Sequence, residues 1–77
     1  MPAPVIIEDA ERLIAGLLEI ITGRGRIPLR LQRISMWDHS NVAKYILRYS
    51  VGGPYVLVKG SVEEIITQLK ETFDADI

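Results

Sequence analysis

Apolar residues recur at helical spacing near both ends of this 77-residue chain. The spacing predicts a first helix from about Glu8 to Thr22, which Gly23 should end because glycine tolerates the left-handed conformation that closes many helices. Ser61 and Glu64 match a capping box and predict a second helix that begins just after Ser61. The stripes that we expect to face the core are Ala10, Leu13, Ile14, Leu17 and Ile21 in the first helix, and Val62, Ile65, Ile66, Leu69 and Phe73 in the second.

Three segments between the predicted helices alternate between apolar and polar residues, which is typical of strands. They are Ile27–Trp37, Val42–Val51 and Pro54–Lys59. The sequence therefore predicts an α+β fold, a single αβββα domain over residues 1–77 with two helices on one face of a three-stranded antiparallel sheet. We expect residues 1–6 to be disordered and residues 74–77 to fray, because acidic residues are unfavourable at a helix C-terminus.

Two turns connect the predicted strands. Gly52-Gly53 is a two-residue hairpin signal, since both positions tolerate a positive φ, and this turn places Tyr49 opposite Val56. Residues 38–41 are all good turn formers and predict the other hairpin connection. The first strand breaks its own alternation at Arg33, which predicts a bulge there.

Alternation along the strands sorts the side chains onto two faces of the sheet. The face expected against the helices holds Leu29, Leu31, Trp37, Ala43, Tyr45, Leu47, Tyr49, Val51, Val56 and Val58. The opposite face mixes cations with apolar and aromatic side chains and has no acid. Exposed apolar patches usually mark interfaces, and arginine and tyrosine contribute strongly to binding. The predicted partner-binding residues are Arg30, Ile34, Lys44, Ile46, Arg48, Tyr55, Leu57 and Lys59. The alternative is that cross-strand pairs such as Ile34 with Ile46 only stabilise the sheet.

The net charge of −1 conceals a segregation of charge along the chain. Residues 1–22 contain four acids and one cation, residues 23–59 contain seven cations and one acid, and residues 60–77 contain five acids and one cation. The basic segment is the predicted sheet and the acidic segments contain the predicted helices. We therefore expect a basic sheet face and acidic helix faces, either of which is suited to binding a partner of opposite charge.

No residue pattern points to catalysis, to a metal or to a cofactor. The chain has no cysteine, and its single histidine leaves a histidine-based metal site without a second ligand of its kind. Asp38, His39 and Ser40 are neighbours in a predicted turn and so lack the geometry of a catalytic triad. We expect a protein with no enzymatic activity, no cofactor and no metal.

No apolar run approaches the roughly 18 residues that a membrane-spanning helix requires. The first four residues lack the basic start of a signal peptide. We therefore expect a cytoplasmic protein that does not act at a membrane.

The αβββα order resembles that of three known groups. Double-stranded RNA-binding domains share it, although the start of their second helix is lysine-rich where this chain has the acidic Gly60-Ser61-Val62-Glu63-Glu64. The Alu-domain proteins of the signal recognition particle are similar in their basic sheet face, which binds RNA, and in pairing to extend the sheet; Arg30, Lys44, Arg48 and Lys59 would play that part here. Some small phage-encoded anti-CRISPR proteins also have this order and inhibit a nuclease through acidic surfaces. Each resemblance rests on the order of the elements.

Two functions from different classes follow as expectations. The first is a non-enzymatic protein-binding module, a small regulator or inhibitor, that binds a partner protein or a second copy of itself through the sheet face or the helix faces. The second is RNA or DNA binding by the basic sheet face, with Tyr55 stacked on a base. The acidic helices favour the first, because they would repel a long duplex.

Overall fold

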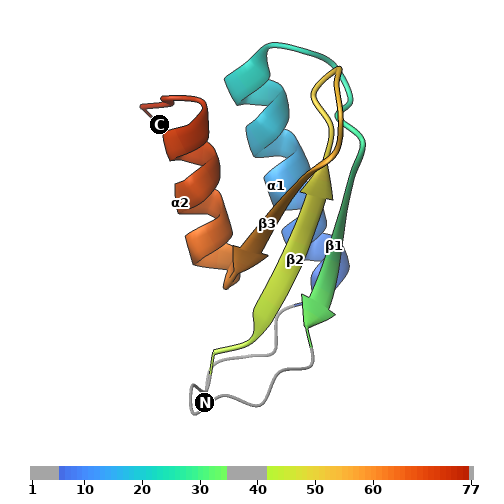
Figure 1. Cartoon of the computed structure of the whole chain (residues 1–77), viewed down its shortest axis with the longest axis vertical. Coiled ribbons are helices and arrows are strands. Elements are labelled where there is room, and N and C mark those ends of the chain that lie inside the picture. The colour runs from blue at the N-terminus through green and yellow to red at the C-terminus, as the bar shows by residue number, and fades with distance from the viewer. Residues whose placement is uncertain (1–5, 35–41, 77) are drawn as a thin grey trace.

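Two helices flank three strands along the chain, as the apolar spacing predicts (Figure 1). The computed structural model describes residues 6–34 and 42–76. Its elements are α1 (Ile7–Thr22), β1 (Leu29–Ile34), β2 (Lys44–Tyr49), β3 (Val56–Gly60) and α2 (Val62–Thr72). The strands form one antiparallel sheet in the order β1-β2-β3, with both helices beside each other on one face, so the predicted α+β fold is confirmed.

Helix α2 begins as its sequence predicts. The Ser61 Oγ accepts a hydrogen bond from the Glu64 backbone N–H at 3.1 Å, and the Glu64 carboxylate accepts one from the Ser61 N–H at 3.1 Å. These bonds satisfy backbone donors that a helix start otherwise leaves unpaired. Ile65 and Leu69 are fully buried, and the rest of the predicted stripe packs partly buried against the core, so the prediction for this helix is confirmed.

Helix α1 is rotated relative to its predicted orientation. Its buried residues are Ala10, Ile14 and Leu18, whereas Leu13 is 60% exposed, so the prediction that Leu13 faces the core is wrong. Leu13 lies about 100° from Ile14 around the helix, and the rotation that buries Ile14 and Leu18 turns Leu13 away from the sheet. The predicted end of the helix is confirmed, because Gly23 adopts a left-handed φ of 67° and its N–H donates to the Glu19 carbonyl at 3.0 Å.

The β2–β3 hairpin keeps the predicted register but has a longer loop. Tyr49 pairs with Val56, as expected, and this is the last pair of the ladder. Of the two turn glycines, only Gly52 has a positive φ, at 70°. The Ser50 N–H donates to the Pro28 carbonyl at 3.0 Å, and the Ser50 hydroxyl donates to the Gly53 carbonyl at 2.6 Å. The first bond joins β2 to the segment before β1, and the second lies within the β2–β3 loop. Strand β2 ends at Tyr49 and β3 begins at Val56, so both strands are shorter than predicted.

Strand β1 pairs with β2 in one unbroken register from Leu29 to Ile34. Arg33 lies opposite Tyr45 and is exposed on the helix side of the sheet, so the bulge predicted at Arg33 does not occur. The predictions for Trp37, for the turn at residues 38–41, and for residues 1–5 and 77 lie outside the described residues.

One apolar core lies between the helices and the sheet. Its buried residues are Ala10, Ile14, Leu18, Ile27, Leu31, Tyr45, Leu47, Tyr49, Val58, Ile65 and Leu69. Of the predicted core face, Leu29, Ala43 and Val51 are partly buried against this cluster, and Val56 in the edge strand β3 is 44% exposed. Within residues 6–34 and 42–76, no helix combines the length and the apolar character that crossing a membrane requires.

Candidate protein-binding surface

The sheet face that points away from the helices is built from three cross-strand rows, and we call it the open face. Its rows are Arg30–Arg48–Leu57, Gln32–Ile46–Lys59 and Ile34–Lys44. The structure thus brings the predicted partner-binding residues of the three strands onto one surface. None of these side chains is acidic.

The first row carries the most accessible part of the open face. Arg30 and Arg48 are both exposed and lie directly opposite each other, and Leu57 beside them is 60% exposed. The Arg48 guanidinium lies over the ring of Tyr55, 5.5 Å from its centroid, and Tyr55 is itself 60% exposed. This cation–π contact places an arginine, an aromatic ring and a leucine side by side at one end of the open face.

The second and third rows are less accessible at their apolar positions. Lys59 is exposed, whereas Ile34 and Ile46 are half-buried. A partner on the open face would therefore meet Leu57 and Tyr55 before it met either isoleucine.

Among the described residues, Lys44 is the cation of the open face that has a carboxylate partner. Its Nζ donates to the Glu64 Oε1 at 2.8 Å, which links the start of β2 to the first turn of α2. The hydrogen bonds from Lys44 and Ser61 and the Lys44 charge lower the pKa of Glu64 to about 2. Because Glu64 already compensates this charge, a partner gains less from Lys44 than from Arg30 or Arg48.

The α1 region presents a second exposed apolar feature, which the sequence reasoning missed. Ile6, Leu13 and Ile20 of the α1 region are 56%, 60% and 71% exposed and follow one another at intervals of seven residues. We call these three residues the α1 stripe. Apolar residues cover more of the α1 circumference than one buried face requires, and that excess was the available signal.

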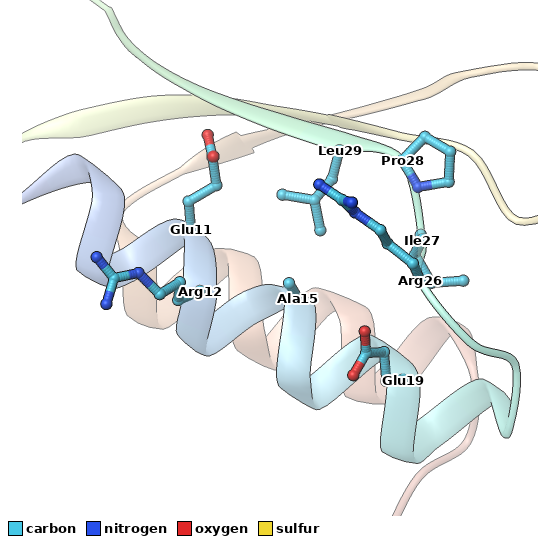
Figure 2. A pocket seen from close by; sticks show the side chains of 8 residues that line it. All are labelled: Glu11, Arg12, Ala15, Glu19, Arg26, Ile27, Pro28 and Leu29. Carbon is cyan, nitrogen blue, oxygen red and sulfur yellow. The ribbon is translucent and has the colours of Figure 1, made fainter.

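A pocket of about 400 Å³ lies where α1 meets the segment that leads into β1 (Figure 2). It is lined by Glu11, Arg12, Ala15, Glu19, Arg26, Ile27, Pro28 and Leu29. Figure 2 shows Glu11 extending from α1 toward the strand, while Arg12 points away from it. The Glu11 Oε2 accepts a hydrogen bond from the Leu31 backbone N–H at 3.0 Å, so this carboxylate pairs a backbone donor of the edge strand.

In the described part of the chain, no group of three or more histidine, cysteine, aspartate or glutamate residues is placed to hold a metal ion. Comparisons with protein-family models, with curated proteins and with solved structures find no match to this chain.

Proposed function

We propose that this chain is a non-enzymatic protein-binding module, a small regulator or inhibitor, that binds its partner through the open face. The observation that carries the proposal is the row Arg30–Arg48–Leu57, with Tyr55 stacked on Arg48. Arginine, tyrosine and a neighbouring exposed apolar side chain are typical of the residues that dominate binding energy at protein interfaces.

The pairing of Arg30 with Arg48 supports a binding role rather than a purely structural one. Like charges directly opposite each other on a sheet are destabilising, and no acid of the open face compensates these two. A side-chain pair that disfavours the isolated fold is consistent with a surface that meets an acidic partner.

The second candidate function is binding of single-stranded nucleic acid by the same face. The stacked Arg48 and Tyr55 favour it, because such a platform also accepts a base, and Arg30 and Lys59 could contact phosphates. The exposed acids of both helices oppose it, since they lower the electrostatic attraction on which nucleic-acid binding depends.

The variants Leu57→Glu and Ile46→Glu test the proposal. We expect both to keep the circular dichroism of the parent and to bind a partner protein at least about tenfold more weakly, because each places a carboxylate in an apolar contact. The partner is captured from nuclease-treated extract, purified, and titrated calorimetrically against each variant. Thr67→Glu adds the same charge on the exposed side of α2 and should bind like the parent.

Equal binding by the parent and both sheet variants would refute the proposal. The nucleic-acid alternative is tested by fluorescence anisotropy with an RNA of about 20 nucleotides in 50 and 200 mM salt. A steep loss of affinity with salt, together with capture that nuclease abolishes, would favour nucleic acid over protein.

A further inference from the structure

We infer that the outer edge of β1 is a second docking site, which binds an extended segment of a partner protein as a fourth strand of the sheet. The bound segment alternates apolar side chains with acidic ones. This edge is separate from the open face, so the inference goes beyond the proposed function and is tested independently of it.

Three residues of β1 turn their backbone groups away from the sheet. Successive residues of an antiparallel strand bond their neighbouring strand alternately. The Ser50 N–H bonds the Pro28 carbonyl, and the register continues from this pair into β1. The alternation therefore leaves the N–H and carbonyl groups of Leu29, Leu31 and Arg33 pointing outward.

One of these outward groups already has an acceptor. The Glu11 Oε2 accepts a hydrogen bond from the Leu31 N–H at 3.0 Å, in the position that a carbonyl of an added strand would take. Within the described residues, the outward N–H groups of Leu29 and Arg33 and the three outward carbonyls have no hydrogen-bond partner. Donors and acceptors that alternate at this spacing match the backbone of an extended peptide.

The edge of β3 offers fewer backbone groups. By the same alternation it turns Leu57 and Lys59 outward, and the Lys59 carbonyl accepts a hydrogen bond from the Gln68 Nε2 at 3.1 Å. The inference therefore assigns the docking site to β1.

The pocket beside β1 favours an apolar side chain on the added strand. Side chains opposite Leu29 and Leu31 would point to the helix side of the sheet, as those leucines do. The pocket of about 400 Å³ lies there, with the short Ala15 on its α1 wall and Leu29 and Pro28 on its strand side (Figure 2). Its charged lining residues are two acids and two arginines, so the lining favours no net charge.

The alternate side chains of the added strand would point to the other side of the sheet, beside Arg30. Arg30 is exposed and its neighbour across the ladder is Arg48. Neither arginine forms an ion pair within the described residues, and β1 contains no acid. An acidic side chain beside Arg30 would place opposite charges on neighbouring strands, which stabilises a sheet.

The first test is an NMR titration of the ¹⁵N-labelled protein with the peptide acetyl-SVEVEVS-amide, which alternates valine with glutamate. We expect a Kd below about 1 mM, with the largest shifts at the amides of Leu29, Leu31 and Arg33. The matched peptide acetyl-SVKVKVS-amide should bind at least about threefold more weakly, because its lysines meet Arg30.

Two methylated peptides test whether the backbone of the peptide pairs with β1. In an antiparallel strand the valines lie opposite the outward residues and donate their N–H groups to β1, whereas the glutamate N–H groups point away. N-methylation of the valines should therefore weaken binding at least about tenfold, and N-methylation of the glutamates should leave it unchanged.

Three variants of the protein test the residues. Arg30→Glu should bind the lysine peptide more tightly than the glutamate peptide, whereas Arg24→Glu, with the same change of charge in the loop before β1, should keep the preference of the parent. Glu11→Ala should bind the glutamate peptide about two- to tenfold more tightly, because the peptide no longer displaces a carboxylate from the Leu31 N–H. Circular dichroism checks that all three fold.

Four results would overturn the inference. They are no binding up to about 1 mM, equal binding by the valine-methylated peptide, shifts centred on Leu57 and Tyr55 instead of β1, or a dimer of the protein alone that Arg33→Pro dissociates. The last would assign the edge to a second copy of the chain. Shifts at Leu57 and Tyr55 would place the peptide on the open face, so the proposed function would stand. If Leu57→Glu instead left partner binding unchanged, the proposed function would fail and the β1 site would remain.

Discussion

Lys44 and Glu64 show how one ion pair joins two elements of the fold. The lysine lies at the start of β2 and the glutamate is the third residue of α2. The Glu64 carboxylate accepts hydrogen bonds from the Lys44 Nζ at 2.8 Å and from the Ser61 N–H at 3.1 Å. These bonds favour its ionised form and lower its pKa from 4.5 to about 2.

We predict that Glu64 makes the protein sensitive to acid. Because its pKa is lower in the folded chain than in the unfolded chain, its contribution to the free energy of unfolding is complete above about pH 4.5 and is lost as the pH falls toward 2. Glu64→Gln should therefore lose less stability than the parent between pH 5 and pH 2, measured as the urea midpoint.

The matched control for this prediction is Glu63→Gln, in the same turn of α2. The Glu63 carboxylate makes no hydrogen bond within the described residues, so this variant should follow the parent. If Glu64→Gln kept the acid dependence of the parent, the ion pair with Lys44 would not form in solution.

Replacing Gly16 and Gly52 by alanine is expected to change the free energy of unfolding in opposite directions. Gly16 lies in the middle of α1, and a Cβ there would have no neighbour within 4 Å. Gly52 has a φ of 70°, and a Cβ there would collide with the Arg24 guanidinium. Gly16→Ala should raise the free energy of unfolding by about 0.5–1 kcal/mol, because alanine favours the helix. Gly52→Ala should lower it by about 1 kcal/mol, because φ is unfavourable for alanine.

Urea unfolding of the two glycine variants at pH 7 measures both changes. If both variants changed the free energy of unfolding by the same amount and in the same direction, the surroundings of these glycines would differ from those described.

At the scale of elements, a side chain of each helix forms a hydrogen bond with a backbone group at one edge of the sheet. Glu11 of α1 accepts the outward N–H of Leu31 in β1, and Gln68 of α2 donates its Nε2 to the Lys59 carbonyl of β3 at 3.1 Å. Edge strands otherwise present unpaired backbone groups that promote aggregation. The helices therefore both bury the core face and pair part of each edge.

We predict that Glu11→Ala opens the β1 edge locally. The Leu31 amide should exchange with solvent at least about tenfold faster, because it loses its acceptor while the β1–β2 ladder bonds remain. Hydrogen exchange followed by NMR measures this rate. Glu11→Gln retains an acceptor oxygen and should restore slow exchange, and Glu19→Ala, in the same pocket, should have no effect on Leu31. An unchanged rate in Glu11→Ala would contradict the pairing.

At the scale of the whole molecule, the charges divide the protein into two layers. The sheet supplies the uncompensated cations of the open face, and the helices carry most of the exposed acids. A chain of 77 residues buries a smaller fraction of its surface than a larger domain and is only marginally stable alone. Association would add to that stability, because the contacts exist only in the folded state.

Short-range patterns in the sequence were sufficient for much of the fold. The capping box of Ser61 and Glu64 located α2, and Gly52-Gly53 set the register of Tyr49 with Val56. Strand alternation assigned the side chains of the open face. Each of these depends on residues a few positions apart, whose conformational preferences act locally.

The remaining features were decided by tertiary packing. Both Glu11–Leu31 and Lys44–Glu64 join residues 20 positions apart, and no spacing rule pairs them. Whether Leu13 or Leu18 is buried depends on how α1 is rotated on the sheet, because apolar residues occupy more than one side of this helix. The sequence by itself therefore determined the elements, their order and the two faces of the sheet. Only the packed structure decided which apolar side of α1 is left exposed, because that rotation is set by the fit of the helix against the sheet.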